Sequence, residues 1–344
     1  MMKTVAIVGA GMAGLAAACA LRAAGIATVV FEKSRGVGGR AATRRIGDCC
    51  FDHGAQYVKA PSAAVQNLIA ATGDAVHIQR PVWTFTATNQ IGPGDLAYDD
   101  EQRWTWPSGI TRLAKYLARD LDVRLETTVA SIHTVGDGYR LSAASGHDLG
   151  QFDAVLLTAP APQSAAILAA GDLAPASAAL IAALHSVQYR RSISITVAFP
   201  HRPAVPWYAL VNIDRHHPIS WLACEHDKPG RAPEGIGLLI AQMSHEWAVA
   251  HWDELQKGTF LPNDPLPPPI AEALAAMQAL AGDLGAPLWI DLQRWRYALP
   301  DTATPLTTMD RIAVAGDMVA GQGRVHLAIE DGWRAADQIR ALLK

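Results

Sequence analysis

The chain has little cysteine, few charges and no run of charges of one sign. Its 344 residues include four cysteines, at positions 19, 49, 50 and 224, and none of them forms a C-x-x-C pair. A chain of this length does not need disulfides to support its core, so we expect reduced thiols and an intracellular, cytoplasmic protein. Cys49 and Cys50 could form a strained vicinal disulfide, but two buried thiols are the simpler expectation.

Charged residues make up only 18% of the chain, and the net charge is −3. Without a basic block, we expect neither nucleic acid nor an anionic membrane as a partner. Half of the residues are hydrophobic, which is enough for two domains or for one domain with a large insertion. The sequence contains no H-E-x-x-H motif, no paired zinc ligands and no recognisable Ser/His/Asp order, so we expect no metal and no hydrolytic triad.

A long unbroken hydrophobic run is also absent. The best candidate, VAIVGAGMAGLAAACALRAAG, could be a secretion signal, a membrane anchor or the start of a nucleotide-binding fold. A membrane helix needs about 20 continuous apolar residues, and three glycines interrupt this run. The pattern instead predicts a strand over Val5–Val8, a helix over Met12–Ala24 ended by Gly25, and a second strand over Thr28–Phe31.

The glycines have the G-x-G-x-x-G spacing of a dinucleotide-binding turn. Gly9 suits the tight turn, Gly11 lets the backbone approach a pyrophosphate, and Gly14 allows the helix to pack closely on the strand. The N-terminus of the helix offers free N–H groups to the phosphates. Glu32 follows the second strand, where its carboxylate can accept hydrogen bonds from a ribose 2′-OH and would repel a 2′-phosphate.

The next segment, EKSRGVGGRAATRR, contains a second glycine group and then Arg40. It resembles the second FAD signature of the flavin amine oxidase superfamily. The resemblance implies that Gly38 and Gly39 pass beside the pyrophosphate and that Arg40 neutralises charge there. A glycine-rich surface turn is the alternative interpretation.

Other segments resemble further parts of the same FAD fold. In RIAVAGDM the superfamily places the carboxylate of Asp317, after Gly316, on the flavin ribityl chain. The segment Gly323–Leu343 reads as a helix whose N-terminus would face the pyrimidine ring and stabilise negative charge on it. RLETTVASI, Arg124–Ile132, would be a strand in which the Val129 backbone touches the adenine. FDAVLLTAPAPQ, Phe152–Gln163, would be a strand followed by a loop near the flavin.

Four segments together resemble the renalase-like branch of this superfamily: FDHGAQYV (51–58), WTWPSGITRLAKYLA (104–118), TAPAPQ (158–163) and RWRYALP (294–300). The resemblance covers most of the chain but is weak over about 173–288. It implies non-covalent FAD on a two-domain fold like that of p-hydroxybenzoate hydroxylase. It also implies oxidation of a small molecule, such as isomers of NAD(P)H, by hydride transfer to flavin N5 with O2 as acceptor. A flavin amine oxidase, a polyene or porphyrinogen desaturase, and a flavin-binding protein without turnover are the alternatives.

The expected fold class is α/β, with a Rossmann-like FAD-binding domain and an inserted α+β substrate domain. We assign residues 1–71, 104–165 and 286–344 to the first domain and residues 72–103 and 166–285 to the second. Within the insertion, RSISITVAFP (191–200) alternates as a half-buried strand does, GIGLLIAQMS (235–244) reads as another strand, and 268–285 reads as a helix with glycine at its end. No second strand–G-x-G-x-x-G–helix unit occurs, so the electrons must come from the substrate and not from a separately bound NADPH.

The candidate site residues follow from these motifs. For the cofactor they are Gly9, Gly11, Ala13, Gly14, Glu32, Lys33, Gly38, Gly39, Arg40, Gly54, Ala55, Gln56, Val129, Gly316, Asp317, Arg324 and Val325. For the substrate pocket they are His53, Tyr57, Glu225, Gln242, Trp295 and Tyr297, where Glu225 and Gln242 align with a polar Asn and a His of bacterial renalases. The chain has His326 and Leu327 where relatives commonly have Glu and Gly. No cysteine follows Cys224, which excludes the cysteinyl-flavin link of some relatives.

Overall fold

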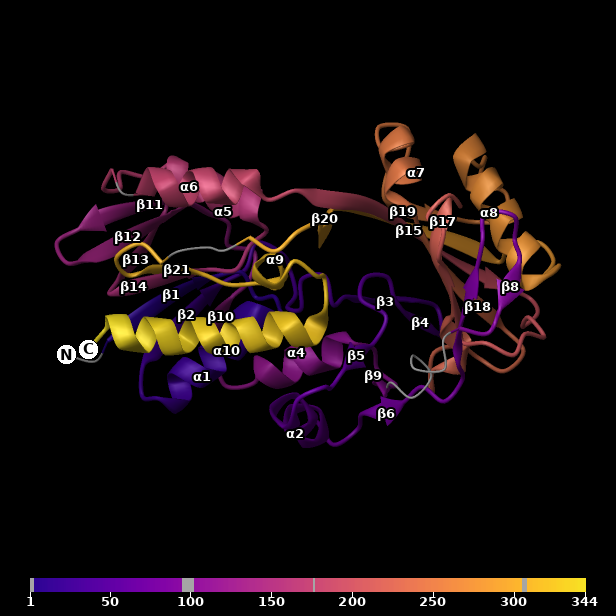
Figure 1. Cartoon of the computed structure of the whole chain (residues 1–344), viewed down its shortest axis with the longest axis horizontal. Helices are drawn as coiled ribbons and strands as arrows, with labels where there is room; N and C mark the ends of the chain where they lie inside the picture. The colour runs from indigo at the N-terminus through magenta and orange to yellow at the C-terminus, as the bar shows by residue number, and fades with distance from the viewer. Residues whose placement is uncertain (1–2, 95–101, 176, 305–307) are drawn as a thin grey trace. The chain divides into compact units, whose positions relative to one another are not determined.

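The computed structural model describes residues 3–94, 102–175, 177–304 and 308–344 (Figure 1). The chain forms two compact units. Unit 1 comprises Met1–Ala41, Thr111–Tyr189 and Leu299–Lys344, and unit 2 comprises Ala42–Ile110 and Arg190–Ala298. Residues 95–101, which belong to the expected substrate domain, lie outside the described residues.

Unit 1 is built on a parallel five-stranded sheet in the order β10-β2-β1-β14-β21. Its strands are β10 (Asp122–Arg124), β2 (Ala27–Phe31), β1 (Thr4–Val8), β14 (Ala154–Leu157) and β21 (Ile312–Val314). The central strands are apolar runs buried on both faces, as expected for a parallel sheet covered on both sides. The predicted strand–turn–helix–strand order is confirmed, since α1 (Met12–Ala23) connects β1 to β2.

Helices and a small antiparallel sheet complete unit 1. The helices are α4 (Thr111–Leu117), α5 (Ala161–Ala169), α6 (Ser177–Ser186), α9 (Asp317–Ala320) and α10 (Val325–Leu342), and the strands are β11 (Val129–Val135), β12 (Gly138–Ala143) and β13 (Asp148–Phe152). Figure 1 shows α10 running beside α1. Their close approach depends on Gly332, because a Cβ there would lie 2.3 Å from the backbone oxygen of Ala13.

Two predicted segments of unit 1 need correction. Residues 124–132 do not form one strand, because β10 ends at Arg124, Glu126 takes a positive φ of 53°, and β11 begins only at Val129. The loop expected to run on to Gln163 is also shorter, since α5 already begins at Ala161 after Pro160. Proline is favourable at the start of a helix, and this signal was missed.

Unit 2 contains an eight-stranded sheet in the order β19-β20-β15-β18-β17-β16-β7-β8. The strands are β19 (Gly258–Phe260), β20 (Trp289–Pro300), β15 (Tyr189–Phe199), β18 (Gly237–Met243), β17 (Ile219–Cys224), β16 (Ala209–Asn212), β7 (Val82–Phe85) and β8 (Ile91–Gly92). One face packs on α7 (His245–Ala250) and α8 (Pro268–Ala281), with Ile195, Leu239 and Met277 in one apolar core. Smaller elements are β3 (Thr43–Ile46), β4 (Cys49–Asp52), β5 (Val58–Lys59), β6 (Val76–His77), β9 (Arg103–Thr105), α2 (Ala63–Ala71) and the 3-10 helix η1 (Glu225–Asp227).

The strand expected to be half-buried, β15, is buried on both faces at its C-terminal end. Ile193, Ile195 and Val197 face the apolar core, and Ser194 and Thr196 on the other face are each only 1% exposed. The predicted helix over 268–285 is shorter, because Gly282 at φ 89° ends α8. Cys49 and Cys50 are free, buried thiols, as expected.

No helix in the described part of the chain combines the length and apolar character needed to cross a membrane.

The first prediction concerns the contact between α1 and α10. Gly332→Ala should lower the free energy of unfolding by about 1–3 kcal/mol, the usual cost of overpacking, although alanine favours helix formation. Gly258→Ala is the control, because a Cβ at Gly258 meets no atom within 4 Å. Chemical denaturation of both variants measures the difference. A denaturation midpoint of Gly332→Ala equal to that of wild type would show that α1 and α10 can move apart without a loss of stability.

Candidate active site

The first glycine loop of unit 1 leaves backbone open where a phosphate group would lie. A Cβ at Gly14 would stand 2.1 Å from the oxygen of Gly9, and one at Gly9, which has φ +112°, would stand 2.7 Å from Thr158 Oγ1. Gly11 is different, since a Cβ there would meet no protein atom within 4 Å. Gly9 and Gly14 therefore serve packing, whereas Gly11 keeps free a space that a pyrophosphate can enter.

The second glycine group lies directly beside the first. Gly38 forms a parallel bridge with Gly11, and the Gly38 N–H donates to the oxygen of Ala10 at 2.8 Å. Gly38 and Gly39 take φ values of +113° and +58°, which a side chain would strain. Two chain segments thus present bare backbone at the N-terminus of α1, and this cradle fits the pyrophosphate of a dinucleotide.

Glu32 occupies the end of β2 with its side chain turned back toward this loop. It is 7% exposed, and its oxygens accept hydrogen bonds from Ala10 N at 2.9 Å and Ser34 N at 2.8 Å. A carboxylate has roughly four lone-pair positions, so about two are left for ribose hydroxyls. The backbone bonds also fix its orientation, which is what a ribose ligand requires.

Arg40 and Asp317 were predicted on separate grounds, and unit 1 brings them together. The Arg40 guanidinium donates to Asp317 Oδ1 at 2.7 Å, across a large separation in sequence. Asp317 begins α9 after Gly316, whose N–H donates to Asp331 Oδ2 at 2.7 Å. Because Asp317 holds the Arg40 guanidinium in place, Arg40 can donate to a phosphate from a fixed position.

The remaining cofactor candidates of unit 1 occupy varied positions. Ala13 is buried in α1, Val129 is the first residue of β11, and exposed Lys33 donates to Gln163 Oε1 at 3.1 Å. Arg324 precedes α10, and Val325 is its first residue. His326, where relatives have Glu, is buried at the same helix start.

The other candidates, Gly54, Ala55, Gln56 and all six substrate-pocket residues, belong to unit 2. The loop that follows Asp52 is held there by side chains that bind its carbonyl groups. Trp295 Nε1 donates to the oxygen of His53 at 2.9 Å, and Gln242 Nε2 donates to that of Gly54 at 2.7 Å. Gln56 Nε2 donates to the oxygen of Asp52. Trp295 and Gln242, two predicted residues from distant parts of the sequence, therefore meet at the loop that contains the predicted residues His53, Gly54 and Gln56.

Aromatic rings line the same loop. The His53 imidazole stacks on Trp295, with centroids 5.4 Å apart and planes 22° apart, and Tyr57 contacts Trp221 at 6.0 Å. Tyr297 lies two residues beyond Trp295 on β20, so the alternation of the strand places it on the same face. Burial lowers the pKa of His53 to about 4, the Arg44 charge acts in the same direction, and Asp52 opposes both. His53 is therefore a neutral imidazole at pH 7.

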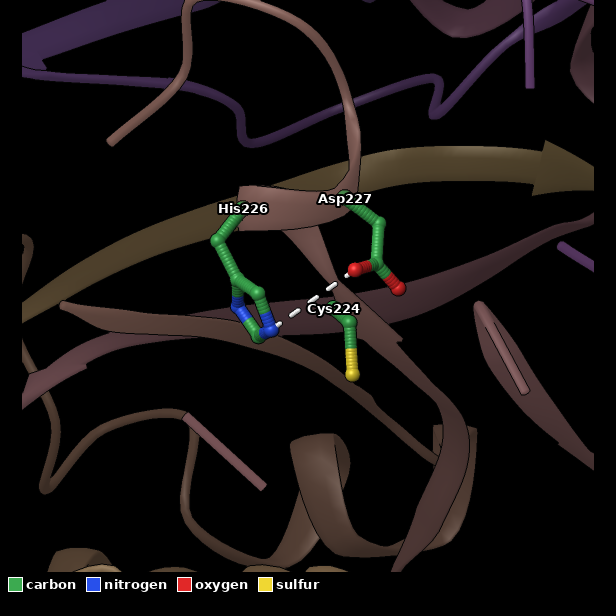
Figure 2. Close-up of side chains that lie close together, drawn as sticks. All are labelled: Cys224, His226 and Asp227. Carbon is green, nitrogen blue, oxygen red and sulfur yellow. Dashed lines mark ion pairs between the residues drawn. The ribbon is translucent and has the colours of Figure 1, made fainter. Parts of the chain in front are cut away.

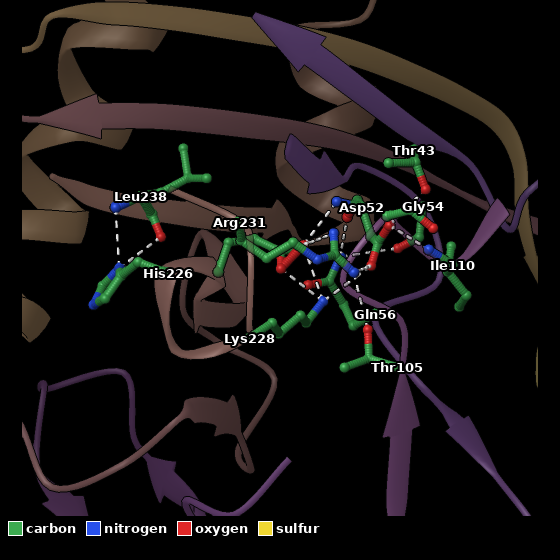
Figure 3. A network of polar contacts seen from close by, with 12 residues as sticks. Thr43, Asp52, Gly54, Gln56, Thr105, Ile110, His226, Lys228, Arg231 and Leu238 are labelled. Atoms are coloured by element: carbon green, nitrogen blue, oxygen red, sulfur yellow. Dashed lines mark hydrogen bonds and ion pairs between the residues drawn. The ribbon is translucent and has the colours of Figure 1, made fainter. Parts of the chain in front are cut away.

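Beneath the loop lies a buried group of four charged side chains, none of which is exposed (Figure 3). Asp52 Oδ2 accepts from Arg231 at 2.6 Å and from Lys228 at 3.2 Å. Glu225 accepts from Lys228 at 2.9 Å and from the Asp52 amide at 2.7 Å. Arg231 also donates to Thr105 Oγ1 at 2.9 Å. We call these four residues the ion cluster.

Glu225 was expected to contact substrate, and its surroundings give a different picture. It lies in η1, and its carboxylate is fully buried and bound to Lys228, Arg231 and the Asp52 amide. Burial raises the pKa of Glu225, although both cations oppose the shift. For Asp52 the cations prevail over burial and lower the pKa to about 2. Glu225 thus has its oxygens engaged inside the protein, and Gln242 is the better placed of the two candidates.

A row of polar groups on the sheet face opposite α8 was not predicted from the sequence. Ser194 pairs with Gln242 across β15 and β18, and Gln242 pairs with Trp221 across β18 and β17. Directly opposite residues point to the same face, so the three side chains lie next to one another. Within the described residues, Ser194 Oγ and Trp221 Nε1 are buried without a hydrogen-bond partner. The alternation of small polar residues in RSISITVAFP was the available signal for Ser194.

Comparison with known proteins agrees with this geometry. Residues 7–72 match the NAD(P)-binding Rossmann-like domain, and residues 79–340 match the flavin containing amine oxidoreductases. The fold and the glycine cradle define a dinucleotide-binding flavoprotein. The chain belongs to the flavin containing amine oxidoreductase family and is an FAD-dependent oxidoreductase that acts on a small molecule.

Solved structures share the fold at low sequence identity. A protein of Exiguobacterium sp. 255-15, provisionally assigned as a protoporphyrinogen oxidase, superposes with a TM-score of 0.75 at 16% identity over 99% of both chains. Putrescine oxidase bound to putrescine gives 0.74 at 16% identity, also over 99% of both chains. The fatty acid isomerase from P. acnes that produces CLA gives 0.70 at 12% identity over 97% of this chain and 98% of that one.

The second prediction concerns Glu32. Glu32→Ala should weaken FAD binding by roughly a hundredfold or more, because two charge-assisted hydrogen bonds of about 1.5–3 kcal/mol each are lost and about 1.4 kcal/mol corresponds to tenfold. Asp120→Ala removes an acid that is 63% exposed and should leave affinity unchanged. Titration of apoprotein with FAD measures both. Equal dissociation constants for Glu32→Ala and wild type would remove Glu32 from the ribose site.

The third prediction is a pH dependence from His53. Its folded-state pKa of about 4 lies below the ordinary 6.5, so between these values the unfolded chain binds a proton that the folded protein does not. Stability should therefore fall as pH decreases from about 6.5 to about 4, by up to about 1.4 kcal/mol per pH unit from this residue. His53→Gln should flatten this part of the profile of unfolding free energy. A slope equal to that of wild type would contradict the neutral, buried imidazole.

Proposed function

We propose that this oxidoreductase is renalase-like and oxidises a small dihydropyridine, with isomers of NAD(P)H as the substrate class. Bound FAD would supply a two-electron acceptor for the hydride of the substrate, and O2, with those two electrons and two protons, would give hydrogen peroxide. The proposal is supported by the four sequence segments that resemble the renalase-like branch. Unit 2 brings residues of two of them, FDHGAQYV and RWRYALP, into contact through His53 and Trp295.

The observation that carries the proposal is the row Ser194–Gln242–Trp221. An indole N–H can only donate, and Trp221 Nε1 is buried without an acceptor in the described part of the chain. A nicotinamide carboxamide supplies such an acceptor through its oxygen and offers an NH2 group to the Ser194 oxygen. A protonated amine has donors only and would leave the Trp221 N–H unpaired, at a cost of about 1–3 kcal/mol. The neutral amine that reacts has a single lone pair, and a hydrogen bond from the indole would occupy the electrons that hydride loss requires.

The protonation states also suit a dihydropyridine. Hydride leaves such a ring without prior removal of a proton, so the site needs no strong base. Neutral His53, with its low pKa, and Glu225, engaged with Lys228, are weak candidates for that role. An amine substrate must instead reach the flavin as a neutral amine, which requires a way to lose its proton.

The site residues and domains follow the sequence assignment. FAD is held non-covalently by the glycines of the two loops, Glu32, Arg40 and Asp317, and Gly54, Ala55 and Gln56 are kept from the sequence as further cofactor candidates. The FAD-binding domain comprises 1–71, 104–165 and 286–344, and the substrate domain comprises 72–103 and 166–285. Gln242, His53, Tyr57, Trp295 and Tyr297 serve the substrate, and the protein works in the cytoplasm.

A flavin amine oxidase is the second candidate. The observation that favours it is the group of rings formed by Tyr57, Tyr208 and Trp221, since aromatic faces attract amines. The fold is shared with a putrescine oxidase. The unpaired indole N–H is the reason for placing this candidate second.

The fourth prediction separates the two. In anaerobic stopped-flow mixing, dihydronicotinamide isomers should bleach the flavin, and primary and secondary amines should not. Trp221→Phe keeps the ring and removes the N–H, so the dihydronicotinamide dissociation constant should rise about tenfold or more. Trp83→Phe is the matched control, because Trp83 packs against the apolar core that includes α8. Rapid bleaching by amines alone would establish the amine oxidase, and no bleaching by either class would indicate a flavin-binding protein without turnover.

A further inference from the structure

Three potential metal ligands converge at the end of β17, where no metal was expected from the sequence. Cys224 ends this strand, and His226 and Asp227 follow in η1. One ligand atom from each lies within 4.8 Å of the other two. Figure 2 shows the thiol, the imidazole and the carboxylate gathered around one small region. The tight 3-10 turn is what allows three residues so close in sequence to point together.

The spacing inside the group suits an ion better than a direct bond. His226 Nε2 and Asp227 Oδ1 are 3.9 Å apart, which is too long for a hydrogen bond. Donor atoms that share a tetrahedral zinc ion at roughly 2.0–2.1 Å lie about 3.3–3.4 Å from each other. If His226 Nε2 and Asp227 Oδ1 moved about half an ångström closer to each other, both could bind the same ion.

Neighbouring groups orient two of the three ligands. His226 Nδ1 is 3.0 Å from the oxygen and from the nitrogen of Leu238. In one tautomer the Leu238 N–H donates to Nδ1 and the proton is on Nε2. In the other, which an ion would select, Nδ1 donates to the Leu238 oxygen and Nε2 has a free lone pair. Arg80 donates to Asp227 Oδ2 at 2.7 Å and leaves Oδ1 for an ion. Such outer partners are the usual means of fixing metal ligands.

The third ligand is a buried thiol without a partner. Cys224 is 0% exposed, and within the described residues its sulfur accepts and donates no hydrogen bond. The His226 side chain is 2% exposed and that of Asp227 is 13% exposed. A desolvated set of sulfur, imidazole nitrogen and carboxylate oxygen is typical of a zinc site. Calcium and magnesium have little affinity for such a ligand set.

We propose that Cys224, His226 and Asp227 bind one Zn²⁺ ion, with water in the fourth position. Binding displaces the proton of the Cys224 thiol to solvent and leaves a neutral imidazole and a carboxylate as the other ligands. The ion would fix η1, whose first residue is Glu225 of the ion cluster, and so stabilise unit 2. The site is independent of the proposed substrate and of the flavin.

The fifth prediction tests this site with zinc alone. FAD-loaded full-length protein, treated with a chelator and then given one equivalent of Zn²⁺, should retain about one zinc per chain after gel filtration, and its Tm should rise. X-ray absorption at the zinc edge should show one sulfur among the ligands. Cys224→Ala and His226→Gln should each abolish retention and the Tm shift. Cys50→Ala, which removes another buried thiol of unit 2, should retain both.

Two results would overturn the proposal. One is wild-type protein that retains no more zinc than Cys224→Ala, and the other is retained zinc without a sulfur ligand. Should Cys224→Ala lose its native flavin spectrum, His226→Gln carries the same comparison. Flavin reduction by any substrate has no part in these measurements, so failure of the proposed function leaves the zinc test unaffected.

Discussion

The arrangement of unit 2 depends on the burial of the Asp52 carboxylate between two cations. A buried charge is tolerated only when it is paired and hydrogen-bonded, and Asp52 has Arg231 and Lys228 on one oxygen and Thr43 and the Ile110 amide on the other. Such clusters contribute little net stability, but removal of one partner is costly because the others stay buried. The ion cluster therefore fixes the position of the backbone at Asp52.

The consequences extend to the loop that begins at the next residue. The Asp52 amide is fixed by Glu225, and the carbonyl groups of Asp52, His53 and Gly54 are bound by Gln56, Trp295 and Gln242. Every one of these donors except Gln56 comes from β20 or β18, so the sheet determines where the loop lies. The first glycine loop of unit 1 is positioned in a different way. Its glycines have no side chains, so neighbouring backbone segments can approach closely. Side-chain hydrogen bonds in unit 2 and missing side chains in unit 1 are thus two different ways of holding a loop in one conformation.

Much of unit 1 could be predicted because its constraints are local. The turn of Gly9 to Gly14 and the strands on either side are dictated by backbone conformation and apolar runs, and these are visible in the sequence. Arg40 and Asp317 were each expected from family resemblance, but their ion pair was not predicted, because no spacing rule indicates it. The ion cluster was not predicted, because Lys228 and Arg231 belong to residue types that are normally exposed and nothing in their surroundings in sequence marks them as buried. The burial of Glu225 was not predicted for the same reason. The roles of all the site residues in binding, that of Glu225 included, stay predictions.

The shared fold places few limits on the reaction. Proteins named as oxidases and as an isomerase superpose over almost the whole chain at 12–16% identity, so the chemistry must reside in the side chains that each presents. Here one face of the sheet carries an indole N–H and a hydroxyl that have no partner among the described residues, while the nearby carboxylates are neutralised by Lys228 and Arg231. A site whose charges are already paired gains little from a charged ligand, because it has no counter-charge to offer in return for desolvation. On this electrostatic ground, and not on the fold, our proposal prefers a neutral, planar molecule that supplies the missing acceptor over an ammonium ion.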